Sequence, residues 1–275
     1  MEKKRAIFFI SDSTAITAHT LGMSLLSQFD GIFFEQTILP FINTVERARQ
    51  AVTRINKAAK RLGTRPILFC TLIDPEIRKV IMTSEGTVFD FFDTFLDRLE
   101  NELRAESTHA VGRYHGIVDN SMYDIRMDAV NYALENDDGV STKYLDKADI
   151  ILIGVSRTGK TPTCLFLALH FGLYAANYPL TEEDVKDLTY VLPWSLQSYR
   201  KKLFGLTINP ERLQKIRTMR RPGSRYASIT QCKAEVAMAE ALFLREQIPF
   251  INVTTMSIEE IAATLIRTRK LECRL

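Results

Sequence analysis

The chain has 275 residues, of which 25% are charged and 46% are hydrophobic, and its 36 basic and 33 acidic side chains leave a formal net charge of +3. This composition is that of an ordinary globular protein, long enough for two domains or one large α/β domain. So small a balance of charge gives no reason to expect a nucleic-acid partner. No segment approaches a membrane span, and the apolar run Ala6–Ile10 is too short for the core of a signal peptide. We therefore expect a cytoplasmic protein that binds neither nucleic acid nor membrane.

The cysteines do not form a recognisable pattern. Cys70, Cys164, Cys232 and Cys273 are far apart in the chain and include no C-x-x-C pair. This spacing indicates reduced thiols rather than a disulfide framework or a zinc site.

In the first part of the chain, short apolar runs alternate with amphipathic stretches. Asp74, followed by Pro75, has the residue types that begin a helix. The resulting βαβαβα order predicts a parallel sheet covered by helices. The expected strands are Arg5–Ile10, Phe33–Leu39 and Pro66–Ile73, and the expected helices are Ala15–Gln28, Thr44–Leu62 and one that begins after Asp74.

The segment from Thr87 to Lys147 is more helical and more charged. It contains two stretches with the composition of loops, "HAVGRYHGIVDNSMYD", which includes His115, and the acidic turn "ENDDG". His115 is the histidine we expect in a functional loop. We place the domain junction near Asn136–Lys147, which gives an N-terminal parallel-sheet α/β domain over residues 1–145 and a C-terminal P-loop kinase-like α/β domain over residues 146–275.

Beyond the junction the alternation of strands and helices resumes. The last helix carries a single apolar stripe that includes Ile258, Ile261 and Leu265. The expected strands are Asp149–Ile153, Leu173–Tyr178, Leu203–Ile208 and Phe250–Val253, and the expected helices are Lys160–Phe171, one that opens at Pro210, and Ser228–Gln247.

The stretch "GVSRTGKT" matches the phosphate-binding pattern G-x-x-x-x-G-K-[ST] in full and falls between an expected strand and an expected helix. Its glycines allow the backbone N–H groups to point at phosphate oxygens, and the following helix presents its positive N-terminus to them. Lys160 supplies a mobile charge for the terminal phosphates, and Thr161 supplies a hydroxyl suited to Mg²⁺. The expected nucleotide-binding residues are Gly154, Val155, Ser156, Arg157, Thr158, Gly159, Lys160 and Thr161.

The acidic partner that usually holds the magnesium ion is not evident. After the loop, no apolar run ends in aspartate. The stretch "ILFCTLID" ends in Asp74, but Asp74-Pro75-Glu76 is also a ready helix start. We favour the capping interpretation of Asp74 and leave the acidic ligand unassigned.

An arginine-rich segment, "RTMRRPGSRYAS", follows the loop. Arg217, Arg220, Arg221 and Arg225 lie around a Pro-Gly turn and could close over a phosphoryl group during its transfer. A solvent-exposed helix end is the alternative, because runs of charge are usually surface.

The opening stretch "ISDSTAITAHT" is a further candidate for phosphate binding. An expected strand runs into Ser11-Asp12-Ser13-Thr14 and then into a helix, which places hydroxyls and free N–H groups together. Simple helix capping is the alternative. As catalytic residues we name Asp12, Lys160 and Arg225.

With these motifs, the sequence resembles the bacterial kinase-pyrophosphorylase regulatory proteins, which regulate phosphoenolpyruvate synthase or pyruvate, phosphate dikinase. The resemblance runs nearly from end to end and is closest to the phosphoenolpyruvate synthase branch. The stretches that carry it are "ISDSTAITAHTLG", "GVSRTGKTPT", "AANYPL", "LFGLTINPERL", "SRYAS" and "IPFINVT".

The resemblance implies a bifunctional enzyme. One activity is an ADP-dependent serine/threonine protein kinase that inactivates its target on a threonine, and the other is a phosphate-dependent phosphorylase that reactivates the target and releases pyrophosphate. The implied cofactors are ADP, inorganic phosphate and Mg²⁺, and the implied partner is phosphoenolpyruvate synthase. A homodimer is compatible with this. The alternatives are a pyruvate, phosphate dikinase regulator with the same chemistry, a non-catalytic ADP-sensing adaptor, and a small-molecule P-loop kinase, which the missing aspartate and the large N-terminal domain disfavour.

Overall fold

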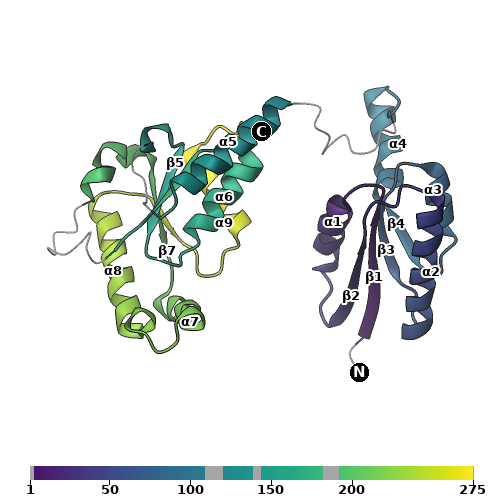
Figure 1. The fold of residues 1–275 in the computed structure, drawn as a ribbon, viewed down its shortest axis with the longest axis horizontal. Helices are drawn as coiled ribbons and strands as arrows, with labels where there is room; N and C mark the ends of the chain where they lie inside the picture. Colours follow the sequence, from purple (N-terminus) through teal and green to yellow (C-terminus); the bar gives the residue numbers. More distant parts are fainter. Residues whose placement is uncertain (1–2, 109–119, 139–143, 182–191, 275) are drawn as a thin grey trace. The chain divides into compact units, whose positions relative to one another are not determined.

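A computed structural model describes residues 3–108, 120–138, 144–181 and 192–274 (Figure 1). His115 lies outside the described residues. The chain divides into two compact units, Met1–Val118 and Asp119–Leu275. Each unit contains one four-stranded parallel sheet, so the chain is a two-domain α/β protein, as the sequence predicted.

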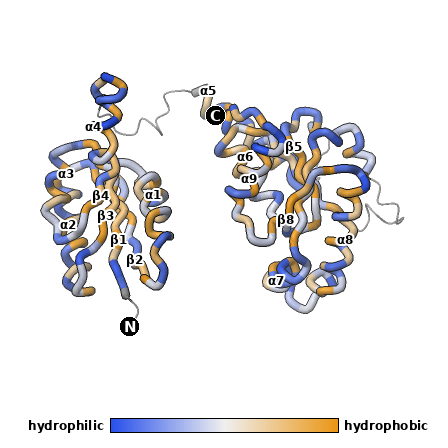
Figure 2. The backbone as a smooth tube through the Cα atoms, turned by 180° about the vertical axis from the view of Figure 1, so that it is seen from behind, coloured by the Kyte–Doolittle hydropathy of each residue, from blue (hydrophilic) through white to orange (hydrophobic). Residues whose placement is uncertain are grey.

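The first unit is a parallel sheet with the strand order β2-β1-β3-β4. In both views, α1 lies on one face of this sheet, and α2 and α3 lie on the other (Figures 1 and 2). The elements are β1 Lys3–Ser11, α1 Ile16–Leu26, β2 Ile32–Leu39, α2 Val45–Leu62, β3 Ile67–Thr71, α3 Pro75–Met82, β4 Thr87–Asp90 and α4 Phe91–Leu103.

The central strand β1 is apolar on both sides because helices cover both faces of the sheet. Ile7 and Phe9 pack with α1, whereas Phe8 and Ile10 pack in the cluster that includes residues of α2 and α3. Figure 2 shows the hydrophobic positions gathered along these strands. The short strand β4 is absent from our sequence predictions, because a four-residue strand carries almost no periodic signal.

Capping fixes where the helices of the first unit begin. The Thr44 side chain accepts a hydrogen bond from the N–H of Arg47 at the start of α2. Asp74 caps α3 by accepting from the N–H groups of Glu76 and Ile77, and Pro75 occupies the first turn, which confirms the capping interpretation of Asp74.

The second unit repeats the same strand topology, with the order β6-β5-β7-β8. The strand β5 is buried along its whole length, and α6 and α8 pack against the sheet. The elements are α5 Asn120–Glu135, η1 Leu145–Lys147, β5 Ile150–Gly154, α6 Lys160–Phe171, β6 Ala175–Pro179, η3 Trp194–Lys202, β7 Leu203–Thr207, α7 Pro210–Arg220, η4 Arg225–Ala227, α8 Ile229–Arg245, β8 Phe250–Asn252 and α9 Ile258–Arg269.

The helix α5 belongs to the second unit, whereas our sequence boundary at 145/146 placed it in the first. Ala129, Tyr132 and Ala133 of α5 are buried in the core of the second unit, where α5 packs against α6 and β6. The boundary therefore lies at 118/119, before α5, and the acidic turn after this helix is part of the second unit rather than a linker.

Among the described residues, no helix is both long enough and apolar enough to cross a membrane.

Candidate functional site

The Gly154–Thr161 loop joins the buried strand β5 to the helix α6. Two glycines make its path possible. Gly154 has a φ of 154°, and a Cβ at this position would lie 2.3 Å from the carbonyl oxygen of Leu206. Gly159, directly before α6, has a φ of 81°. Side chains other than hydrogen are disfavoured at both positions, by close packing at the first and by the left-handed backbone at the second.

Lys160 is the first residue of α6, and its side chain points back into the loop. It is buried, with an exposure of 5%, and its Nζ donates hydrogen bonds of 2.9 Å to the carbonyl oxygens of Gly154 and Val155. Burial lowers the pKa of Lys160 to about 8, although the nearby carboxylate of Asp138 acts in the opposite direction. The loop therefore holds a positive charge at the place where a phosphate-binding loop needs one.

A second polar group surrounds Thr161. The Thr161 hydroxyl donates a 2.8 Å hydrogen bond to Oδ1 of Asp137, and the amide of Asn177 contacts both of these residues. Asn177 lies in the middle of β6 with an exposure of 2%, and its Oδ1 accepts from the N–H of Asp138 at 3.3 Å. The acidic turn after α5 is thus fixed beside the first turn of α6.

This arrangement places a carboxylate, that of Asp137, beside Thr161, the predicted magnesium ligand. Asp137 lies in the acidic turn at the predicted domain junction, and the packing of α5 against α6 brings it to Thr161. A hydroxyl beside a carboxylate suits Mg²⁺, which prefers oxygen ligands and takes few of them from protein. No cluster of three or more metal-binding His, Cys, Asp or Glu side chains occurs in the described parts of the chain. The donor set therefore fits a magnesium ion shared with ligand phosphates.

The arginine-rich segment is not uniform. Arg217 is fully buried in α7 and forms an ion pair of 2.6 Å with Glu235. Arg220, Arg221 and Arg225 surround a turn at Pro222-Gly223, and all three are exposed. The surface interpretation of the segment is therefore wrong for Arg217.

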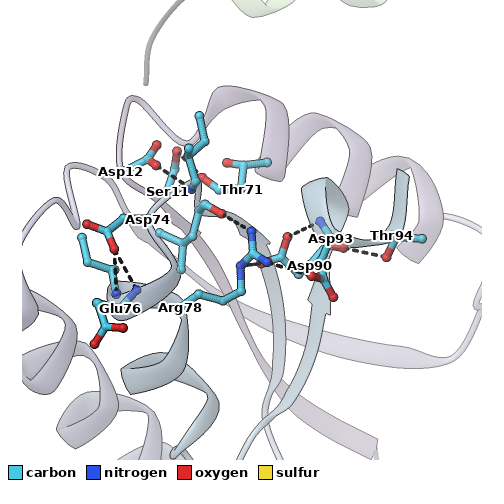
Figure 3. A network of polar contacts seen from close by, with 12 residues as sticks. Ser11, Asp12, Thr71, Asp74, Glu76, Arg78, Asp90, Asp93 and Thr94 are labelled. Carbon is cyan, nitrogen blue, oxygen red and sulfur yellow. Dashed lines mark hydrogen bonds and ion pairs between the residues drawn. The ribbon is translucent and has the colours of Figure 1, made fainter. Parts of the chain in front are cut away.

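Asp12 lies in the first unit, at the carboxyl end of β1. Its exposure is 6%, and its Oδ2 accepts a 2.9 Å hydrogen bond from the N–H of Ile73 (Figure 3). Burial is the main cause of a raised pKa for this carboxyl group. The adjacent Ser11 hydroxyl donates to the Thr71 carbonyl and accepts from the N–H of Ser13.

The stretch around Asp12 does not cap α1. Ala15 occupies the N-cap position with a φ of 63° and makes no side-chain cap hydrogen bond. The capping alternative for Ser11-Asp12-Ser13-Thr14 is therefore wrong.

Figure 3 also shows Arg78, which links the ends of β3 and β4. Its guanidinium contacts the carbonyl of Leu72 and the carboxylates of Asp90 and Asp93. Arg78 therefore has a structural role, because its contacts connect the end of β3 to the end of β4.

Of the proposed site residues, the eight of the Gly154–Thr161 loop and Arg225 lie in the second unit, whereas Asp12 lies in the first. Asp137 is absent from the site residues predicted from the sequence. Asn177 is a polar residue in an otherwise apolar strand, and this is a signal present in the sequence.

Comparison with known proteins gives a consistent result. The profile of the family described as kinase/pyrophosphorylase matches residues 7–266. A protein from Alkalilimnicola ehrlichii is 56% identical over 274 residues, which cover 100% of this chain and 99% of that protein. Proteins from Hahella chejuensis and Pseudomonas aeruginosa are each 54% identical over at least 98% of both chains. All three are provisionally named phosphoenolpyruvate synthase regulatory protein. The chain therefore belongs to the kinase/pyrophosphorylase family.

Proposed function

We propose that this protein is a bifunctional regulator of phosphoenolpyruvate synthase. It phosphorylates a target threonine with ADP as the donor, and it removes the phosphoryl group with inorganic phosphate, releasing pyrophosphate. One observation carries the proposal: in a chain of the kinase/pyrophosphorylase family, the charged side chain of Lys160 and the Thr161–Asp137 pair lie at the same end of β5.

The loop supplies the groups that hold a diphosphate. Its backbone N–H groups and the N-terminus of α6 would bind the phosphate oxygens, and Lys160 would exchange its two carbonyl partners for the transferred group. Thr161 and Asp137 would hold Mg²⁺, which neutralises charge on the phosphates when it is bound. Asn177 would keep both side chains in register.

The two activities can share this site because they are the same kind of transfer. In the kinase reaction, the threonine hydroxyl releases its proton to the solvent and its oxygen forms a bond to the β-phosphorus of ADP. The bond from that phosphorus to the bridging oxygen breaks, and AMP leaves with the bridging oxygen. In the phosphorylase reaction, an oxygen of inorganic phosphate attacks the phosphorus of phosphothreonine, and the threonine oxygen leaves with a proton. Inorganic phosphate thus takes the place of the α-phosphate of AMP. Arg220, Arg221 or Arg225 would close over the transferred group, whose charge grows on its equatorial oxygens.

Label transfer tests the proposal. ADP carrying ³²P in its β-phosphate should label phosphoenolpyruvate synthase on threonine, and ATP freed of ADP should not. A non-catalytic adaptor would bind ADP without labelling the target, and labelling of pyruvate, phosphate dikinase instead would assign the other branch of the family. Equal labelling from purified γ-³²P-ATP would contradict the choice of donor.

The shared site has its own test. ADP should inhibit the phosphorylase competitively with inorganic phosphate, because the α-phosphate and inorganic phosphate occupy one subsite. Non-competitive inhibition would place the two reactions at separate sites.

A further inference from the structure

Arg217, in the arginine-rich segment, makes a contact that leads into the Gly154–Thr161 loop. Its Nη2 donates to the carbonyl oxygen of Ser156 at 3.2 Å and to Oε2 of Glu235 at 2.6 Å. A fully buried guanidinium is costly unless its charge is paired, and Glu235 supplies that pairing. The loop backbone is therefore one of the fixed partners of this charge.

Tyr226 joins the same residue of the loop from another side. Its ring lies 4.1 Å from the Arg217 guanidinium, its carbonyl oxygen accepts from Arg217 Nη1 at 3.1 Å, and its hydroxyl lies 3.0 Å from the hydroxyl of Ser156. Ser156 is thus held twice, at its carbonyl by Arg217 and at its side chain by Tyr226.

The position held in this way is one where the backbone needs support. Arg157, the next residue, has a φ of 79°, a conformation that costs free energy for any residue with a Cβ and persists only when its surroundings impose it. The direction of the N–H groups in the loop depends on that conformation. Small errors in such directions are costly wherever a reaction depends on placement.

We propose that Arg217 and Tyr226 are positioning residues that fix the loop at Ser156 and join it to the turn carrying Arg220, Arg221 and Arg225. This proposal rests on the proposed function. Neither residue needs to touch the nucleotide, because both act through the backbone and hydroxyl of Ser156. Because Tyr226 directly follows Arg225, a displacement of the loop is passed to the arginine turn.

The chain contains a matched control for Arg217. Arg274 pairs with Asp149 at 2.8 Å, donates to the carbonyl of Gly172 at 2.7 Å, and lies 4.6 Å from the ring centre of Tyr174. The types of contact are the same, although the Arg274 side chain is 37% exposed and that of Arg217 is buried. The carbonyl bound by Arg274 belongs to the residue after α6, at the opposite end of the helix from the loop. Arg217→Lys and Arg274→Lys therefore remove similar contacts, and only the first disturbs the loop.

The first experiment measures hydrogen exchange of the loop amides in the protein without nucleotide. Arg217→Lys and Tyr226→Phe should accelerate exchange across residues 154–161 by about fivefold or more, the value expected for the loss of one hydrogen bond. Arg274→Lys should leave these amides unchanged. Equal effects of Arg217→Lys and Arg274→Lys, after correction for global stability, would assign Arg217 a merely structural role.

The second experiment is a double-mutant cycle on the affinity for ADP. Ser156→Ala and Tyr226→Phe should each weaken binding by about fivefold, and the double variant should be no worse than either one, because the two hydroxyls serve each other. Independent effects that multiply, or no effect of Tyr226→Phe, would overturn the proposal. If Arg217→Lys does not fold, this cycle and the exchange rates of Tyr226→Phe decide the question.

The two experiments separate the inference from the proposed function. If the wild-type protein does not bind ADP, the proposed function fails, while the exchange rates still show whether Arg217 and Tyr226 hold the loop. If ADP binds normally and the variants behave like Arg274→Lys, only the inference fails.

Discussion

The two units of this protein use one strand topology for two different electrostatic environments. In each unit the first strand, β1 or β5, lies inside the sheet. The second strand of the unit pairs with it on one side, and the third and fourth strands lie on the other side. Ligands of such sheets bind at the carboxyl ends of the strands where the order reverses, which means beyond β1 and β5. At β5 the chain places a buried lysine, and at β1 it places a buried aspartate. The comparison shows that the sheet topology fixes where a ligand site can lie, whereas the loop after the first strand determines the charge of the buried side chain there.

The largest expected effect comes from removing the charge at the end of β5. Lys160→Met should lower both transfer activities by about a thousandfold or more, because no other ammonium contacts the loop backbone among the described residues. Initial rates with labelled ADP measure it. Lys202→Met is the control, since Lys202 also donates to a backbone carbonyl, that of Asp146, outside the loop. Near-normal turnover of Lys160→Met would show that the lysine at the end of β5 is not needed for transfer.

Arg225→Ala tests whether the arginine turn takes part in phosphoryl transfer at the site beyond β5. Loss of one charge-assisted contact to a transition state costs about 2–4 kcal/mol, or roughly two to three powers of ten in rate. Kinase and phosphorylase should slow by similar factors, since in the proposed mechanism the two transition states differ only in whether the phosphate opposite the threonine carries adenosine. Assays of both activities on one preparation decide this, and collapse of only one of them would mean separate sites. A merely solvated arginine would change neither rate.

Asp137→Asn should slow transfer by about a hundredfold and raise the Mg²⁺ concentration needed for half-maximal rate. Asparagine keeps the acceptor for the Thr161 hydroxyl, so the change removes charge rather than packing. Rates titrated with Mg²⁺ measure it. Asp146→Asn serves as the control, because Asp146 lies in η1 and its backbone carbonyl accepts from Lys202 outside the loop. An unaltered Mg²⁺ requirement in Asp137→Asn would show that Asp137 is not a ligand of the metal.

Asp12→Asn tests how the buried carboxyl group at the end of β1 affects the stability of the first unit. The pKa of Asp12 is raised in the folded protein, so the native state binds more protons than the unfolded state between the two pKa values, and stability falls as pH rises through that interval. Asp12→Asn should therefore increase the free energy of unfolding of the first unit at pH 7 by about 1 kcal/mol or less, with the gain vanishing near the ordinary carboxyl pKa of about 4. Urea unfolding at pH 4 and pH 7 checks this. A stability loss at pH 7 would show that the carboxylate is a structural acceptor for Ile73.

The parts of the fold that sequence could predict are those with local causes. The Gly154–Thr161 loop can be recognised because one short stretch contains the whole phosphate-binding pattern. Asp74-Pro75 is likewise recognisable as a helix start from adjacent residues. Asp137 could not be found, because its role arises only when α5 packs against α6. The same limit applies to Arg217, since a run of arginines does not reveal which one turns inward.

The carbonyl partners of Lys160 would compete with any anion for this side chain. An anion bound by Lys160 would have to replace two hydrogen bonds of a desolvated ammonium, so its apparent affinity would be its intrinsic affinity reduced by the fraction of molecules in which those bonds are broken. A small ion of low charge would form weaker contacts than the two it replaces, whereas a diphosphate that contacted the lysine, the helix end and a metal at once would form stronger ones. These two hydrogen bonds would therefore favour a diphosphate over simple anions at Lys160.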